Sequence, residues 1–324
     1  MLLSDVSNKT ILISALDWGG GHTTRCVSLI ERLIKSGNRI IFAGNEEQNS
    51  FMKNEFKSIE LEYLQGYEIS LSSKQNTYFQ IFRQLVKISR AIKNELLFVE
   101  QMVAKYNLDL ILSDNRYGFR SKEVNSIFIG HQLNLELPFF KNWTNNVLSK
   151  LVNKFDRVWI VDDQTVNLSG RLSSTTRLNI PYDYIGFLAR FQTEKRTKKY
   201  DYLIIISGPN PENGLFLKEI EKAIVRSKNS YVIVSKVKSE QKIKGVDYFY
   251  APSTKMMNNL LNESEVIISK AGYTTLMELY SLGKKAILMP THGQFEQEYL
   301  AKHIKEDVFT FIGDYSNLKG VLNS

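Results

Sequence analysis

The first segment that could do chemistry is a run of glycines followed by a histidine. Gly19, Gly20 and Gly21 precede His22, and the run links a β-branched segment to one with helical spacing. Glycines carry no Cβ, so a ligand can approach the backbone amides closely, and a helix start favours an anion. An imidazole takes up and releases protons near neutral pH, which suits a general base. A tight turn without a chemical role is the alternative interpretation.

Two later turns have a similar character. Ser207 and Gly208 follow a second β-branched run, and Lys270, which precedes Ala271 and Gly272, follows a third. Each turn precedes a predicted helix, so two helix starts could hold a diphosphate, with amide dipoles supplying the positive potential. Ordinary helix capping is the alternative interpretation for each turn alone. Their placement after successive strands favours a ligand site.

Asp114 is an acidic residue that could act together with His22. It follows the predicted strand Asp109–Ser113, and its carboxylate could orient the imidazole of a general base. The alternative is that Asp114 only caps the loop after the strand. Asp162 and Asp163 are adjacent rather than spaced as in a D-x-D motif. The sequence therefore predicts a reaction that uses no metal ion and no other cofactor.

Composition and charge exclude several classes of protein. The chain has 324 residues, 43% of them apolar, which suits two domains and excludes a wholly disordered protein. One cysteine and four histidines exclude a disulfide scaffold and a structural zinc site. The net charge of +8 comes from interspersed residues without a nucleic-acid motif, so DNA binding is not expected. Thr24 stands where a G-x-G-x-x-G fingerprint has its last glycine, which disfavours nicotinamide binding.

The sequence also predicts where the protein works. Its N-terminal segment lacks the basic start and the cleavage site of a signal peptide, and no apolar run is long enough to span a bilayer. We therefore expect a cytoplasmic protein. Arg83, Lys87 and Arg90 form a basic stripe at helical spacing beside aromatic residues, which could make a peripheral contact with an anionic membrane. A solvated helix face is the alternative interpretation of this stripe.

Strands and helices alternate along the whole chain, which predicts an α/β fold with parallel sheets covered by helices on both faces. Runs of β-branched residues predict strands at residues 10–15, 39–43, 60–64, 109–113, 126–130, 157–161, 202–207, 231–234, 247–250, 266–269 and 285–289. Apolar residues at helical spacing predict helices at residues 23–35, 47–56, 78–105, 143–153, 215–226, 254–261, 274–282 and from about 296.

The segment Pro181–Tyr200 is charged and weakly patterned, which makes it the best candidate for a linker. We therefore expect two Rossmann-like domains, residues 1–180 and residues 181–324, that face a cleft. Ligands of open α/β sheets bind at the carboxyl ends of the strands, and the glycine turns described above lie at such ends.

At these residues the sequence resembles the two-domain GT-B glycosyltransferases of family 28. The resemblance rests on the turn Gly20-Gly21-His22 and on Ser269–Ala301, which reads SKAGYTTLMELYSLGKKAILMPTHGQFEQEYLA. The second stretch is the more specific of the two. The resemblance implies an N-terminal domain on the acceptor side and a C-terminal domain that binds a nucleotide-sugar donor.

The resemblance also implies roles for single residues. Backbone amides of Ala271, Gly272 and Tyr273 would bind the donor diphosphate, and Glu278 falls where a family carboxylate accepts hydrogen bonds from the ribose. Gln297 falls at a position that contacts the sugar hydroxyls. Glu298 stands where the family has a second glutamine. Ser207 and Gly208 lie near a family phosphate loop, although Pro209 and Pro211 differ from its pattern. On the acceptor side, the resemblance implies roles for Gly20, Gly21, His131 and Asn134.

These observations predict a metal-independent, inverting glycosyltransferase with His22 as general base. By resemblance the donor is linked to UDP, and Lys270 could help to neutralise the departing diphosphate. The sequence leaves the acceptor open among glycans, lipid-linked compounds and small molecules. One alternative is a nucleotide-sugar hydrolase, which would release free sugar without an acceptor. Another is a non-catalytic protein that binds nucleotide sugars or glycans, which would tolerate the loss of His22.

Overall fold

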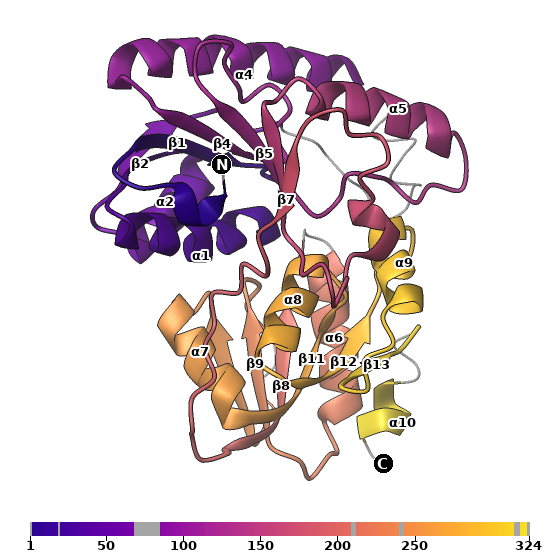
Figure 1. The fold of residues 1–324 in the computed structure, drawn as a ribbon. Coiled ribbons are helices and arrows are strands. Elements are labelled where there is room, and N and C mark those ends of the chain that lie inside the picture. Colours follow the sequence, from indigo (N-terminus) through magenta and orange to yellow (C-terminus); the bar gives the residue numbers. More distant parts are fainter. Residues whose placement is uncertain are drawn as a thin grey trace. The chain divides into compact units, whose positions relative to one another are not determined.

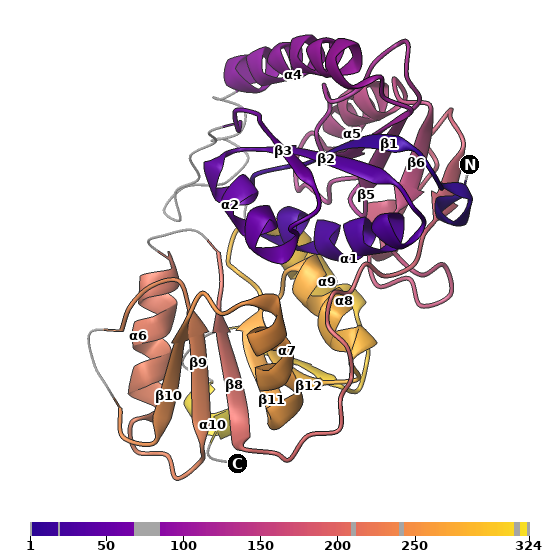
Figure 2. The same ribbon diagram turned by 90° about the vertical axis from the view of Figure 1, so that its left-hand side faces the viewer.

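A computed structural model of the chain describes residues 2–18, 20–67, 85–208, 212–239, 243–313 and 318–322. The chain divides into two compact units, Met1–Leu188 and Ala189–Ser324. Each unit contains a parallel β-sheet with helices on both of its faces (Figure 1 and Figure 2). The predicted α/β class, with two Rossmann-like domains, is therefore confirmed.

The sheet of the first unit has the strand order β3-β2-β1-β4-β5-β6-β7, and every neighbouring pair is parallel. Helices α4 and α5 cover one face of this sheet, and α1 and α2 cover the other (Figure 1). The strands and helices are β1 (Thr10–Ala15), α1 (Gly21–Lys35), β2 (Arg39–Gly44), α2 (Glu46–Glu55), β3 (Glu60–Tyr63), α4 (Leu85–Tyr106), β4 (Leu110–Asp114), β5 (Ser126–Gly130), α5 (Lys141–Val152), β6 (Arg157–Ile160) and β7 (Tyr182–Tyr184).

Continuous apolar runs become the buried central strands of the first unit. All five residues of β4 are buried, as expected for a parallel strand that is covered on both faces. On the α4 side, Leu12, Ile111 and Phe119 belong to one apolar cluster with Val99 of the helix. On the other side, α1 begins directly after the β1 turn. The carboxyl end of β1 therefore determines the position of the first turn of α1.

The sheet of the second unit has the order β10-β9-β8-β11-β12-β13, again with all pairs parallel. Helices α6 and α10 contact each other, whereas α7 contacts β8 and β11 (Figure 2). The elements are β8 (Tyr200–Ile206), α6 (Glu212–Ile224), β9 (Tyr231–Ser235), β10 (Val246–Tyr250), α7 (Thr254–Glu263), β11 (Ser264–Lys270), α8 (Tyr273–Ser281), β12 (Lys285–Met289), α9 (Phe295–His303), β13 (Phe309–Phe311) and α10 (Leu318–Leu322).

The structure differs from the sequence prediction in the predicted linker. Tyr182–Tyr184 forms strand β7 and pairs with β6, so the first unit continues past residue 180 to Leu188. The short strand β13 was not predicted, because three residues are too few to show a periodic pattern. Of the long helix predicted from residue 78, the structure describes α4 from Leu85 onward, and the part before Leu85 lies outside the described residues.

Candidate active site

The carboxyl ends of β1 and β4 bring the predicted catalytic pair together in the first unit. These strands are neighbours, with Ala15 in register with Asp114, the last residue of β4. The chain turns after β1 and enters α1 at Gly21, so His22 lies in the first turn of this helix. His22 Nδ1 lies 2.8 Å from Asp114 Oδ1. The contact that the sequence suggested is therefore present.

Arg25, which the sequence analysis did not single out, completes this pair. It lies three residues after His22 on α1, so both side chains are on the same face of the helix. The guanidinium binds the carboxylate of Asp114 in a bidentate manner: Nε donates to Oδ2 at 2.5 Å and Nη2 donates to Oδ1. Both side chains are buried, with exposed fractions of 0% for Arg25 and 1% for Asp114.

The charge of Asp114 is fixed by these neighbours. Burial alone would raise the pKa of this carboxyl, but Arg25 and then His22 outweigh burial and lower the pKa from 3.8 to about 2. Asp114 is therefore an anion at neutral pH. An ionised carboxylate only accepts hydrogen bonds, so His22 Nδ1 carries the proton. Asn115 Nδ2 lies 3.4 Å from the same nitrogen, and the shorter contact to the carboxylate decides the tautomer.

This tautomer leaves Nε2 of His22 as the nitrogen that can accept a proton. The side chain of His22 is 18% exposed, in contrast to its buried partner Asp114. A half-buried imidazole backed by a buried anion has the arrangement of a general base with an orienting carboxylate. The carboxylate also stabilises the imidazolium that forms when the base takes up a proton.

The predicted acceptor-side residues His131 and Asn134 have different surroundings. His131 is buried, and its Nδ1 accepts a hydrogen bond from Arg25 Nη1 at 2.7 Å. Its ring centroid lies 6.4 Å from that of His22, so it belongs to the same cluster. Asn134 instead donates to the carbonyl of Ser174 at 2.6 Å, and its Oδ1 accepts from Arg177 at 3.1 Å. The amide of Asn134 therefore holds two loops of the first unit together.

In the second unit, the carboxyl ends of the adjacent strands β8 and β11 bring Gly208 and Lys270 together. Gly208 has a φ of 112°, a left-handed conformation that glycine adopts without strain. Its carbonyl accepts a hydrogen bond from Asn213 Nδ2. A Cβ placed on Gly208 would lie 3.4 Å from Lys270 Nζ, so this ammonium lies against the turn. Lys270 is itself largely buried, which places a positive charge at the edge of the sheet.

Three polar atoms near this edge are buried and have no hydrogen-bond partner among the residues that the structure describes. They are Ser269 Oγ in β11, Asn213 Oδ1 in α6 and Thr291 Oγ1 after β12. Leaving such a group unpaired costs about 1–3 kcal/mol, and native proteins rarely leave several together without a reason. Bound ligands are one such reason. None of these three side chains is among the site residues that were predicted from the sequence.

The backbone amides at the start of α8 were predicted to bind a diphosphate, and one of them pairs with a neighbouring strand. Gly272 is the N-cap residue and provides no capping side chain, so the amides of the first turn are not capped from that position. However, the backbone N–H of Ala271 donates to the carbonyl of Met289 at 3.1 Å. The Ala271 amide is therefore engaged with the neighbouring strand, because the pairing of β11 with β12 continues through this residue, and its contact with a diphosphate stays a prediction.

Glu278, the predicted ribose ligand, is buried in α8 and forms an ion pair. Its Oε1 accepts a hydrogen bond from Arg190 Nε at 2.8 Å. Burial raises the pKa of Glu278 above its ordinary value, although Arg190 acts in the opposite direction. The carboxylate is thus held in place by a cation that the sequence analysis had assigned to a linker. Its role toward a ribose stays a prediction.

Gln297 and Glu298 hold the loop between β12 and α9. Gln297 Oε1 accepts from the backbone N–H of Thr291, and Glu298 Oε1 accepts from that of Gly293, both at 2.8 Å. The amide of Gln297 also donates to Gln294 Oε1 at 2.6 Å. Gln297 Oε1 and Glu298 Oε1 are therefore engaged with their own loop. Contacts of either residue with a sugar stay predictions.

Comparison with known proteins shows what this chain is similar to. Residues 217–321 match the model of the glycosyltransferase family 28 C-terminal domain. An uncharacterized glycosyltransferase of Methanosarcina mazei is 23% identical over 321 residues, which cover 91% of this chain and 84% of the relative. The chain is a glycosyltransferase with the GT-B fold, and its C-terminal part resembles family 28.

Solved structures share the fold of this glycosyltransferase. TcCGT1 in complex with UDP has a TM-score of 0.66 at 11% identity, and the match covers 98% of this chain and 90% of that one. The spinosyn rhamnosyltransferase SpnG, complexed with thymidine diphosphate, also has a TM-score of 0.66, at 10% identity, and covers 97% of this chain and 90% of that one.

Two further properties of the glycosyltransferase bear on the sequence predictions. Within the described ranges, no group of three or more histidine, cysteine, aspartate and glutamate side chains could hold a metal ion. None of the described helices is long and apolar enough to cross a membrane. In the predicted basic stripe, Lys87 and Arg90 are exposed on α4, whereas Arg83 lies outside the described residues. Peripheral membrane contact therefore stays a prediction.

Proposed function

We propose that this glycosyltransferase moves a sugar from a nucleoside-diphosphate donor, UDP-linked, to an acceptor hydroxyl, with inversion and without a metal ion. The observation that carries this proposal is the hydrogen-bonded series His22, Asp114 and Arg25. It supplies a base with a defined tautomer next to a permanent negative charge. General-base help of this kind is typically worth about 10²–10⁴ in rate.

The proposed donor site is the carboxyl edge of the second sheet. The ammonium of Lys270 and the turn at Gly208 are suited to an anion, and the buried hydroxyl of Ser269 is left to bind one. Diphosphate ligands in two neighbours of the same fold, UDP in TcCGT1 and thymidine diphosphate in SpnG, support a nucleotide donor. Glu278, held by Arg190, is the proposed acceptor of hydrogen bonds from the ribose.

The proposed reaction is a single displacement. The acceptor oxygen forms a bond with the anomeric carbon while its proton passes to Nε2 of His22. The bond from the anomeric carbon to the phosphate oxygen breaks at the same time, and its electron pair leaves with the nucleoside diphosphate. Asp114 stabilises the imidazolium, and Lys270 offsets the charge that develops on the leaving group. Attack opposite to the departing oxygen inverts the anomeric centre.

The experiment that tests this proposal measures binding and products separately. Calorimetry with UDP, thymidine diphosphate and their sugar derivatives should show donor binding, with UDP compounds bound most tightly. The products are then assayed with and without a panel of glycan, lipid-linked and small-molecule hydroxyl acceptors. The proposal predicts sugar transfer that requires an acceptor and gives the opposite anomer. Free sugar released at the same rate without any acceptor would indicate a hydrolase, and binding without turnover a non-catalytic protein.

A further inference from the structure

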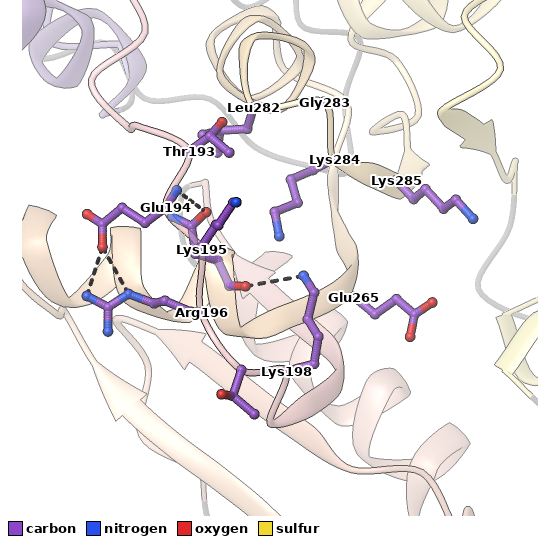
Figure 3. A pocket seen from close by; sticks show the side chains of 12 residues that line it. Thr193, Glu194, Lys195, Arg196, Lys198, Glu265, Leu282, Gly283, Lys284 and Lys285 are labelled. Carbon is purple, nitrogen blue, oxygen red and sulfur yellow. Dashed lines mark hydrogen bonds and ion pairs between the residues drawn. The ribbon is translucent and has the colours of Figure 1, made fainter.

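A hollow of about 660 Å³ lies at the amino-terminal edge of the second sheet (Figure 3). Its walls are the segment before β8, the start of β11 and the turn between α8 and β12. Strand β8 has seven residues, so the hollow is about 20 Å from the carboxyl edge where Gly208 and Lys270 lie. The hollow is therefore separate from the proposed donor site.

Ammonium groups converge in this hollow. Lys198 Nζ donates to the carbonyl of Ser264 at 2.7 Å, and Lys284 Nζ donates to the same oxygen at 3.0 Å. The two nitrogens are consequently less than about 6 Å apart, a separation at which like charges repel. Figure 3 shows the end of Lys195 turned toward the same region, whereas Lys285 and Glu265 are directed away from it.

Two carboxylates near the hollow are engaged with other cations, whereas Glu265, which lines the hollow, is directed away from the ammonium groups (Figure 3). Glu194 pairs with Arg196 at 2.9 Å, and Glu263 pairs with Arg196 at 3.4 Å and with Lys199 at 3.2 Å. In the part of the chain that the structure describes, neither Lys198 nor Lys284 forms an ion pair with a carboxylate. The hollow therefore has an excess of positive charge that the described residues do not neutralise.

Both lysines bind the carbonyl of Ser264, the C-cap residue of α7, but one cation is enough to cap a helix. Lys198 Nζ also donates to the carbonyl of Asn262 at 3.2 Å, at the end of α7, where a cation is favoured. Lys284 is only 9% exposed and binds a carbonyl that Lys198 already occupies. Burial and the neighbouring Lys198 lower the pKa of Lys284 to about 7. A bound anion would favour the charged form of this side chain.

We propose that the hollow binds a phosphate-bearing anion through Lys195, Lys198 and Lys284. Compact ammonium charges suit a phosphate, and three of them can offset its two negative charges. One water takes about 30 Å³ of liquid volume, so the hollow has room for a phosphate that is attached to a larger group. That group is either a soluble phosphomonoester or the headgroup of an anionic lipid.

Labelling with pyridoxal 5′-phosphate tests the proposal on the full chain. The aldehyde forms an imine with a neutral lysine amine, borohydride reduces the imine, and mass spectrometry of peptides reports each lysine. We expect Lys284 to be labelled at least tenfold faster than Lys218, an exposed lysine of α6. Inorganic phosphate should slow the labelling of Lys284 at least fivefold and that of Lys218 less than twofold. Equal labelling rates, or no protection by any phosphate compound, would overturn the proposal.

A variant and two vesicle preparations sharpen this test. Lys198→Gln should raise the phosphate concentration needed to protect Lys284 at least fivefold, whereas an unchanged concentration would mean that Lys284 is merely reactive. Protection by inorganic phosphate assigns a soluble ligand. Protection only by phosphatidylglycerol vesicles, and not by phosphatidylcholine vesicles, assigns a lipid headgroup. In either case the labelling reports Lys284 itself, so binding at the donor site does not affect the result.

Discussion

The carboxyl edges of the two sheets differ in how far their polar groups are satisfied. In the first unit, His22, Asp114, Arg25 and His131 form one hydrogen-bonded series. In the second unit, Ser269 Oγ is buried without a partner in the described part of the chain, although it lies at the equivalent edge of its sheet. The series around Asp114 is thus organised before any substrate binds, although Trp18 Nε1, three residues after β1, is also buried without a partner in the described part of the chain. The hydroxyl of Ser269 has no such internal partner to hold it.

This difference agrees with the two tasks that a glycosyltransferase has to perform. A base must hold its tautomer and orientation through the reaction, and buried neighbours that do not move provide this. A donor site must bind and release a charged nucleotide in every cycle. Buried polar groups that have no hydrogen-bond partner in the ligand-free protein carry a desolvation cost. A ligand that supplies the missing hydrogen bonds removes this cost, which makes its binding more favourable.

The largest effect should come from removing Arg25. Arg25→Met leaves the buried carboxylate of Asp114 without its main counter-charge, so we expect the free energy of unfolding of the first unit to fall by about 3–5 kcal/mol. Urea denaturation followed by fluorescence measures this. The matched control is Arg39→Met, which breaks an exposed pair with Glu60 and should leave the midpoint almost unchanged. Similar losses for both variants would mean that the series around Asp114 is not specially organised.

Acid should weaken the first unit through Asp114. Its pKa is lowered to about 2 in the folded protein, against an ordinary value of 3.8. A carboxyl with a lowered folded pKa stabilises the fold above its unfolded pKa, and this contribution is lost as the pH falls from about 5 to about 2. We expect a contribution of about 2 kcal/mol. In Asp114→Asn the loss of stability over this pH range should be smaller by that amount, and an unchanged pH profile would contradict the assignment.

Ser269→Ala should change stability less than the loss of Arg25 or of the Asp114 charge, and it should not lower stability. Removing an unpaired buried hydroxyl should leave the stability of the ligand-free protein unchanged or raise it by about 1 kcal/mol, while UDP binding weakens about fivefold. Ser264→Ala is the matched control in the same strand, because its hydroxyl already donates to Leu260 at 2.7 Å. That variant should lose stability and keep its UDP affinity. Calorimetry and thermal unfolding of both variants decide between a ligand contact and a packing effect.

The sequence predicted the strands of the sheets well, because buried parallel strands are continuous apolar runs. It missed β7 and β13, which have three residues each and therefore no pattern to detect. The contact of His22 with Asp114 was predictable because both residues adjoin strand ends. The role of Arg25 was not predictable, because an arginine inside a helix usually faces solvent, and only its burial and its hydrogen bonds to Asp114 show that it points inward.

Within the donor stretch, the sequence could place residues on elements but could not resolve their hydrogen bonds. Strand β11 extends to Lys270, beyond the predicted end at Ser269, and the ladder with β12 then uses the amide of Ala271. Strand ends are set by pairing with a neighbour rather than by local propensity. The ion pair of Glu278 with Arg190 depends in the same way on a contact between distant parts of the chain.

The most direct test of the account separates turnover from donor binding in His22→Ala, with His303→Ala as a histidine control from the end of α9. Removing the base should lower kcat at least tenfold, while the Kd for the nucleotide-sugar donor changes less than twofold, and the control should retain both values. Comparable turnover in His22→Ala and the unchanged protein would contradict the assignment of His22 as the general base.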